Sequence, residues 1–207
     1  MLQILGRASS INVRKVLWLC AELDLPYAHE PWGSGSRSTE DPDFLALNPN
    51  AKVPVIRDGD FVLWESNAIC RYLALTRQRS DLLPTAPAAR AIVEQWMDWQ
   101  ATDLTSAARY AFMGLVRENR AYRDPNAIQA SVASWNRHMA ILEDQLQCTE
   151  AYATGDSFTL ADIVLGLSAH RWFLTPVARP SLPAVESYYA RLTQRPGFRK
   201  LDCNRVP

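Results

Sequence analysis

Residues 48–69 read NPNAKVPVIRDGDFVLWESNAI, and this segment contains the clearest local folding signals in the chain. Two β-rich runs, at 53–57 and 61–64, flank Asp58-Gly59-Asp60. An Asp-Gly pair between such runs is a strong signal for a β-hairpin. Residues 66–76 follow with apolar side chains at helical spacing. The segment therefore predicts an antiparallel hairpin that leads directly into a helix.

The residues before this segment alternate between strand and helix patterns. Residues 2–6 and 27–31 have strand character, and the pattern over residues 10–24 predicts an amphipathic helix between them. A loop rich in glycine and serine at 33–39 precedes one or two helical turns at 42–47. A helix that joins two strands indicates a parallel pair, to which the hairpin adds antiparallel strands. We therefore expect an α/β domain with a mixed four-stranded sheet.

The residues after this segment predict a second, all-helical domain. Residues 79–87 contain two prolines and no helical period, so we expect a linker there between domains at 1–78 and 88–207. Beyond the linker the strand patterns disappear. The apolar spacing predicts a helical bundle with a short helix after Pro196 and longer helices at 88–120, 126–147, 159–174 and 182–194.

A capping box marks the start of one of these helices. Thr159 is followed three residues later by Asp162, which takes the place that Glu or Gln usually holds, and Phe158 and Ile163 flank the pair as a hydrophobic staple. We therefore expect a structural role for Asp162 in preference to a catalytic one.

Composition excludes several classes of function. Lys and Arg total 22 and Asp and Glu total 22, and both parts of the chain are balanced, so no basic field favours nucleic acid or an anionic membrane. No apolar run approaches the roughly 20 residues of a membrane span. The four cysteines form no C-x-x-C pair, which predicts reduced thiols in the cytoplasm. Three isolated histidines have no metal-ligand spacing, so no metal site is expected.

Three short segments hold the candidate functional residues: 9–16, 52–54 and 64–69. The first and third place hydroxyl side chains at predicted helix N-termini, where unpaired N–H groups and the helix dipole favour an anion. Plain helix capping is the competing interpretation of these serines. Pro54 starts a strand, and it forms either an ordinary strand entry or a cis bond in a tight turn.

Taken together, the three segments resemble the cytosolic glutathione transferases of the serine type, in a bacterial branch like the theta and phi classes. The resemblance spans essentially the whole chain, and it includes the segments 10–16, 48–55, 63–69, 158–162 and 195–198. The tyrosine-type classes fit poorly, because no tyrosine precedes residue 27. The resemblance implies a thioredoxin-like domain followed by a helical domain, glutathione as co-substrate and a homodimer.

The resemblance also implies roles for individual residues. Ser10 donates its hydroxyl to the glutathione sulfur, with the adjacent Ser9 as a competitor for this role, and Asn12 is a second donor near the sulfur. The remaining glutathione contacts implied are the Val53 backbone ahead of a cis Pro54, Glu65 and Ser66 at the γ-glutamyl end, and Lys52 and Arg37 at the glycyl carboxylate. The family often has more basic residues in the loop at 33–39, where this chain has Arg37 alone.

The energetics of thiol ionisation agree with a serine donor. A thiol of pKa ~8.5 is only a few per cent ionised at pH 7, and the thiolate is the nucleophile. Lowering that pKa by ~2 units takes about 2.7 kcal/mol. A hydrogen bond to a charged group contributes about 1.5–3 kcal/mol, so Ser10 together with a helix N-terminus is sufficient.

The second substrate is less well defined. The resemblance places it between the domains, and the implied contacts are Tyr110, Phe112, Met113 and Trp172, although each of these also fits a packed core; Arg109 is a candidate for an anionic group. The expected reaction is attack of the thiolate on a small apolar electrophile. Glutathione-dependent reduction of peroxides or disulfides, and a non-catalytic binding role, are the alternatives.

Overall fold

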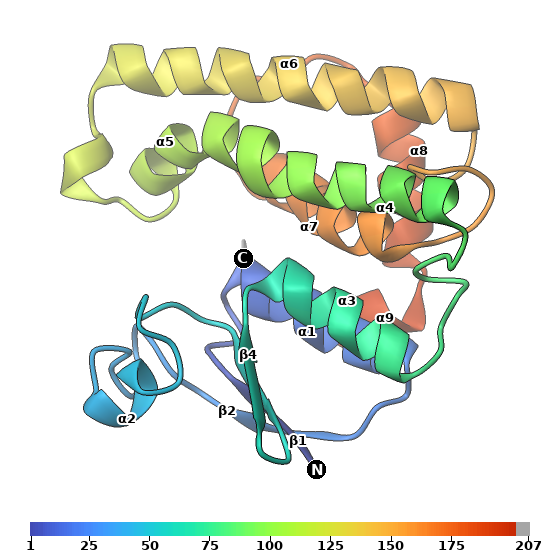
Figure 1. Cartoon of the computed structure of the whole chain (residues 1–207). Helices are drawn as coiled ribbons and strands as arrows, with labels where there is room; N and C mark the ends of the chain where they lie inside the picture. Colours follow the sequence, from blue (N-terminus) through green and yellow to red (C-terminus); the bar gives the residue numbers. More distant parts are fainter. Residues whose placement is uncertain (202–207) are drawn as a thin grey trace. The chain divides into compact units, whose positions relative to one another are not determined.

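The computed structural model describes residues 1–201, and these form two compact units (Figure 1). Unit 1 comprises Met1–Leu83 together with the described residues from Arg195 onward, and unit 2 comprises Pro84–Gln194. The end of the described chain is therefore part of the N-terminal unit.

Unit 1 is built on a four-stranded mixed sheet with strand order β2-β1-β3-β4. β1 pairs in parallel with β2, and β3 is antiparallel to both β1 and β4, as the sequence predicts. The elements of unit 1 are β1 (Leu2–Leu5), α1 (Ile11–Glu22), β2 (Tyr27–Glu30), α2 (Pro42–Leu45), β3 (Val55–Asp58), β4 (Phe61–Trp64), α3 (Ser66–Thr76) and α9 (Pro196–Arg199). The expected strand at 53–57 begins later, at Val55, because Pro54 has no N–H to donate to the ladder.

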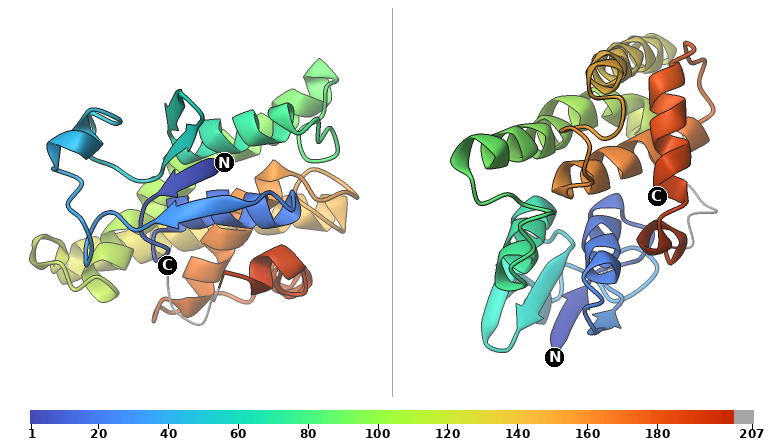
Figure 2. Two further views of the ribbon diagram at one scale, coloured as in Figure 1. Left: turned by 90° about the horizontal axis from the view of Figure 1, so that it is seen from below. Right: turned by 90° about the vertical axis from the view of Figure 1, so that its right-hand side faces the viewer.

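Alternating side chains of the strands supply two apolar layers. Ile4 and Ile56 are paired across β1 and β3, and both are completely buried. α1 and α3 cover this face of the sheet (Figure 2). The neighbouring residues Leu5 and Val55 point to the opposite face, where they pack with Phe44 of α2. The central strands β1 and β3 are thus largely buried, whereas the outer strands β2 and β4 are exposed or half-buried along their length.

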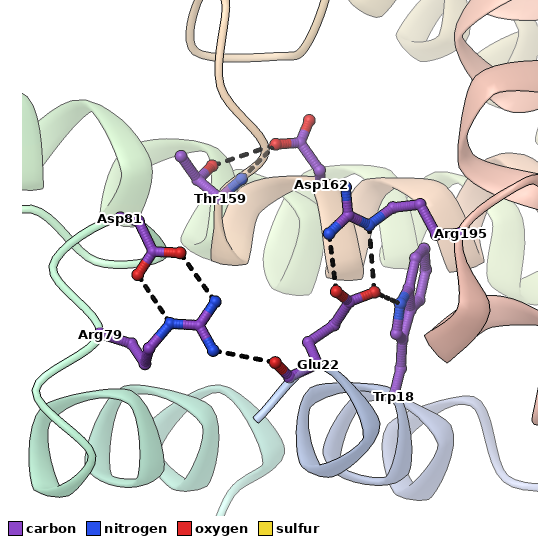
Figure 3. Close-up of polar contacts among 7 residues, drawn as sticks. All are labelled: Trp18, Glu22, Arg79, Asp81, Thr159, Asp162 and Arg195. Carbon is purple, nitrogen blue, oxygen red and sulfur yellow. Dashed lines mark hydrogen bonds and ion pairs between the residues drawn. The ribbon is translucent and has the colours of Figure 1, made fainter. Parts of the chain in front are cut away.

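The C-terminal segment is held on unit 1 by one carboxylate (Figure 3). Glu22, at the end of α1, accepts hydrogen bonds from Trp18 Nε1 at 2.8 Å and from Arg195 Nε at 3.0 Å and Nη2 at 2.6 Å. The Phe198 ring packs edge-on against Trp18, with ring centroids 5.0 Å apart. A side chain at Gly197 would collide with Trp18, so the close packing of α9 on α1 depends on glycine there.

Apart from an isolated β-bridge between Tyr152 and Gly155, the regular elements among the described residues of unit 2 are all helices. They are α4 (Pro87–Trp99), a π-helical turn η1 (Gln100–Leu104), α5 (Thr105–Leu115), a 3₁₀ turn η2 (Arg120–Tyr122), α6 (Pro125–Thr149), α7 (Leu160–Leu174) and α8 (Pro183–Thr193). α7 is almost entirely buried at the centre of unit 2, and the buried face of α6 includes Trp135, Met139 and Leu142. The mixed α/β domain followed by an all-helical domain is the predicted fold class.

The single helix expected at 88–120 is wrong, because the structure divides it. The π-helical turn lies where the buried Gln100 side chain donates a hydrogen bond to Ser168 Oγ of α7 at 2.9 Å. α5 then ends at Leu115, and Glu118 adopts a positive φ of 50°. At Gly114 the helix touches the Tyr122 carbonyl oxygen so closely that no side chain would fit. The first interruption coincides with a contact between residues 68 positions apart, and the second with a close approach of the chain to itself across eight residues.

The predicted capping box is present at the start of α7 (Figure 3). Asp162 is completely buried, and its Oδ2 accepts hydrogen bonds from the Thr159 N–H at 2.8 Å and from the Thr159 hydroxyl at 3.1 Å. Its Oδ1 accepts from the Ala153 N–H and the Tyr188 hydroxyl, both at 2.9 Å. Burial raises the pKa of Asp162, and these four hydrogen bonds oppose that shift. Asp162 is therefore fully engaged within unit 2.

Among residues 1–201, no helix combines the length and the apolar character needed to cross a membrane. No group of three or more His, Cys, Asp or Glu side chains among residues 1–201 is placed to hold a metal ion. Cys20 and Cys70 are buried free thiols, and burial raises the pKa of each to about 12. Cys148 is free and exposed, and Cys203 lies outside the described residues.

Candidate functional site

One edge of the sheet in unit 1 collects the predicted glutathione residues. The strand registers align Glu30, Leu5, Val55 and Trp64 in one row across the four strands. β1, β2 and β4 end at this row, and β3 begins there. Every segment that holds a predicted glutathione contact adjoins the row, and so do the N-termini of α1 and α3. The topology alone therefore gathers the three segments and the loop that contains Arg37 around one end of the sheet.

Ser10 is the N-cap residue of α1, yet its hydroxyl does not cap the helix. Its backbone is extended, with φ −83° and ψ 127°, and its carbonyl accepts the first helical hydrogen bond, from Arg14 N–H at 2.9 Å. The capping interpretation of this serine therefore does not account for its side chain. Ser10 is half-buried, whereas Ser9 and Asn12 are exposed. An anion beside Ser10 faces the unpaired N–H groups of the first turn of α1.

Gly6 allows the segment at residues 9–16 and the segment at residues 52–54 to approach each other closely. A Cβ at Gly6 would lie 2.6 Å from Val13 Cγ2 of α1 and 2.9 Å from Val53 Cβ. Only glycine fits there, and its φ of 147° also disfavours other residues. The start of α1 and the segment before β3 therefore meet at this glycine. The Val53–Pro54 peptide bond is cis, as one of the two sequence interpretations predicts.

Glu65 and Ser66 form a strained entry to α3. Glu65 is exposed and has φ 72° and ψ 109°, a conformation that costs a non-glycine residue about 1–3 kcal/mol and that clusters at functional sites. Ser66, the first residue of α3, is only 6% exposed. Its N–H is one of the unpaired donors of the helix N-terminus. This arrangement presents a carboxylate and a group of N–H donors side by side, which suits an amino acid with its ammonium and carboxylate groups.

The two basic candidates differ in their surroundings. Lys52 is exposed, and its backbone carbonyl accepts from Asn48 Nδ2 at 2.7 Å. Arg37 stacks on Trp32, with its guanidinium carbon 3.9 Å from the ring centroid. Its Nη atoms lie 3.1 Å from Glu30, 3.8 Å from Asp41 and 3.9 Å from Asp43, so its charge is shared among three carboxylates.

Sequence reasoning missed a buried cation beneath this site. Lys15 of α1 is 2% exposed, and its Nζ donates to Asn67 Oδ1 of α3 at 3.1 Å. Asn67 follows Ser66 directly, so the contact joins the first turns of the two helices that border the site. The only signal in the sequence is a lysine at a core-facing position of an amphipathic helix.

The four predicted acceptor residues have different environments within unit 2. Phe112 is 5% exposed, Met113 is half-buried, and Tyr110 packs against Tyr122 with ring centroids 5.1 Å apart. Trp172 is 1% exposed, and its Nε1 donates to Asn136 Oδ1 of α6 at 2.9 Å, so it packs in the core of the unit. Arg109 is exposed and reaches the Tyr122 hydroxyl at 3.4 Å.

The chain has a thioredoxin-like sheet whose strand ends adjoin the predicted glutathione residues, and an all-helical unit follows it. This combination is typical of glutathione-dependent proteins. Family models narrow this class. The glutathione S-transferase N-terminal domain matches residues 9–76, and the glutathione S-transferase C-terminal domain matches residues 125–191. The chain belongs to the glutathione S-transferase family, and it is an enzyme of that class.

Individual relatives agree with this assignment. Glutathione S-transferase GstB of Escherichia coli (strain K12) is 39% identical over 203 residues, which is 97% of each chain. The theta class glutathione S-transferase of Xanthomonas axonopodis pv. citri, solved with glutathione bound, is 38% identical with a TM-score of 0.92 and covers 100% of this chain and 99% of its own. Elongation factor 1-gamma 3 of Oryza sativa subsp. japonica is 30% identical over 79% of this chain and 39% of its own length.

Proposed function

We propose that this enzyme binds glutathione along the strand-end row of unit 1 and ionises its thiol for attack on a small electrophile. The observation that supports this most directly is the Ser10 side chain at the N-terminus of α1. Its hydroxyl is not used as a cap and is free to donate to a thiolate. Ser10 does not lose its own proton in this scheme; it acts as a hydrogen-bond donor to the sulfur, and Asn12 is a second donor.

The remaining contacts hold the two ends of the tripeptide. The Ser66 N–H and hydroxyl bind the γ-glutamyl carboxylate, and the Glu65 carboxylate pairs with the γ-glutamyl ammonium. The Val53 backbone pairs with the cysteinyl unit ahead of cis Pro54. Lys52 neutralises the glycyl carboxylate, with Arg37 as a weaker contributor because three carboxylates already share its charge.

A direct test measures the ultraviolet absorbance of the thiolate when glutathione binds to the wild-type protein. We expect bound glutathione to be largely ionised at pH 7, when free glutathione is only a few per cent ionised. Bound glutathione that stays protonated would contradict the proposal and would favour a non-catalytic binding role.

Replacing Ser66 with alanine tests the γ-glutamyl contact. We expect glutathione binding to weaken about tenfold, because a hydrogen bond to a charged carboxylate contributes about 1.5–3 kcal/mol and the backbone N–H remains. Isothermal titration calorimetry measures the loss. Ser38→Ala, on the exposed loop before α2, is the matched control and should bind as the wild type does. Unchanged affinity in Ser66→Ala would remove this side chain from the site.

The electrophilic acceptor substrate binds to residues of unit 2 in this proposal. We propose that Phe112, Met113 and Tyr110 line its binding surface, with Trp172 packed in support, and that the thiolate attacks an electrophilic carbon. The same thiolate also suits reduction of peroxides, so the choice of acceptor decides the reaction.

We infer that the enzyme is a homodimer. Each unit leaves large apolar side chains exposed, and a second copy of the chain could cover them. In unit 1 they include Phe61 and Leu75, and in unit 2 Ile92 and Ile141. Ile141 also lines a groove of about 430 Å³ that is formed by α4 and α6. Light scattering is expected to give twice the chain mass of 23.3 kDa, and the mass of a single chain would contradict the inference.

We infer further that the enzyme works in the cytoplasm, where it removes reactive electrophiles. Three free thiols, Cys20, Cys70 and Cys148, are suited to a reducing compartment. Cell fractionation followed by detection of the protein tests this inference, and recovery outside the cytoplasmic fraction would contradict it.

A further inference from the structure

The guanidinium group of Arg7 is a positive charge beside the glutathione site that none of the contacts described above uses. Arg7 follows β1 and is half-buried, and its carbonyl oxygen accepts a hydrogen bond from the Ser10 N–H at 3.0 Å. This bond closes a turn of four residues, which keeps the Cα atoms of its first and last residues within about 7 Å of each other. The backbone therefore holds Arg7 close to the proposed sulfur donor.

The Arg7 side chain extends toward the loop that follows β2. A Cβ at Gly33 would lie 3.9 Å from Arg7 Cδ and 4.0 Å from Thr39 Cγ2, so the arginine stem and the end of the loop both lie beside this glycine. In the part of the chain that the structure describes, the Arg7 guanidinium forms neither an ion pair nor a hydrogen bond. A half-buried cation without a protein partner therefore lies between the turn at Ser10 and the loop at 33–39.

Lys52 approaches the same end of the site from another segment. A Cβ at Gly6 would lie 2.9 Å from Val53 Cβ, so the residue before Arg7 and the residue after Lys52 are close neighbours. Arg7 and Lys52 flank this contact, and Lys52 is exposed. Two cations from separate segments therefore border the end of the site at which Lys52 is proposed to neutralise the glycyl carboxylate.

Arg37 and Arg7 differ in their ability to bind a further anion. Three acidic side chains already share the charge of Arg37, whereas the planar fork of donors on Arg7 matches a carboxylate and has no acceptor among the described residues. Cover of the loop by the arginine stem, with the charge in water, is the simpler explanation of Arg7 taken alone. That explanation predicts no effect of Arg7 on the binding of glutathione.

We propose that Arg7 binds the glycyl carboxylate of glutathione, together with Lys52. This inference rests on the proposed function, since it names a further binding residue of the same site. A carboxylate that leaves water loses its hydration, and charge-assisted hydrogen bonds from a guanidinium compensate for that loss. Arg7 is a specificity residue in this scheme, because it favours a thiol substrate that carries a negative charge at its glycyl end.

A matched pair of ligands isolates this carboxylate. Glutathione and its glycinamide analogue have the same thiol and the same γ-glutamyl group, and they differ in having a carboxylate or a neutral amide of nearly the same size at the glycyl end. Isothermal titration calorimetry gives a Kd for each ligand. The ratio of the Kd for the amide to the Kd for glutathione then reports recognition of the anion. We expect a ratio of about ten or more for the wild-type protein, because charge-assisted hydrogen bonds are lost with the amide.

We expect Arg7→Gln to lower this ratio about fivefold, with the Kd for the amide within about twofold of the wild-type value. Arg77→Gln is the matched control, since it removes the same charge from the exposed C-cap of α3, at the opposite end of that helix from Ser66. Eleven helical residues span about 16 Å, which is twice the screening length of about 8 Å at physiological ionic strength. The ratio for Arg77→Gln should therefore equal that of the wild type.

Three results would overturn the inference. They are equal affinity of the wild type for the two ligands, a ratio that Arg7→Gln leaves unchanged, including an equal loss of affinity for both ligands, and an equal fall of the ratio in Arg77→Gln. Failure of the proposed function is distinguishable from all three, because it appears as bound glutathione that stays protonated. The ratio of the two Kd values does not depend on the ionisation of the thiol, which both ligands share.

Discussion

Replacing Ser10 with alanine is expected to raise the pKa of the bound glutathione thiol by about 1–2 units, since the lost hydrogen bond to the sulfur anion contributes about 1.5–3 kcal/mol. The pKa rises because the hydroxyl stabilises only the thiolate form, so its removal favours the protonated thiol. Conjugation near neutral pH should slow about tenfold, and the difference should shrink as pH rises above the new pKa.

The measurement is a titration of the thiolate absorbance in the complex, together with the pH profile of kcat/KM. Affinity for glutathione should change little, because the ends of the tripeptide are held by other residues. Ser9→Ala is the matched control, as Ser9 is the adjacent exposed serine. If Ser9→Ala produces the shift and Ser10→Ala does not, the sulfur donor is Ser9. If neither variant shifts the pKa, no serine in this segment ionises the thiol.

Local sequence signals were sufficient to predict most of unit 1 and the start of α7 in unit 2. The Asp-Gly turn, the capping box and the helix that joins two strands each depend on residues close together in the chain. The three segments of the candidate site followed from the same signals, because strand ends and helix starts are local features that a sheet then brings together, whereas the roles of individual residues came from the family resemblance. The row formed by Glu30, Leu5, Val55 and Trp64 explains why separate motifs converge on one edge.

Features that depend on distant residues could not be predicted. The apolar period continues through residues 100–104, and the π-helical turn there is accompanied by a hydrogen bond from Gln100 to the distant Ser168. The three carboxylates around Arg37 come from the end of one strand and from residues near α2. Arg171 shares no local pattern with Phe112, although the fold places it over that ring. Specific side-chain partners of this kind require the tertiary structure.

Replacing Asp162 with alanine is expected to lower the free energy of unfolding by about 3–5 kcal/mol, because several buried hydrogen bonds are lost together. The variant loses the helix cap, and it leaves the Thr159 and Ala153 N–H groups buried without their acceptor. Asp162→Asn keeps the shape of the side chain and one acceptor oxygen. Its amide NH₂ group, however, replaces the second oxygen and faces hydrogen-bond donors, so the free energy of unfolding should fall by about 2–3 kcal/mol.

Chemical denaturation followed by intrinsic fluorescence measures both Asp162 variants, given a cooperative transition for unit 2. Asp144→Asn, on α6, is the matched control and should lie within about 0.5 kcal/mol of the wild type because it removes a surface carboxylate. Thiolate formation in folded Asp162→Asn should be normal, since Asp162 takes its hydrogen bonds from Thr159, Ala153 and Tyr188 of unit 2. A raised thiol pKa in that variant, with stability unchanged, would instead assign Asp162 a part in the chemistry.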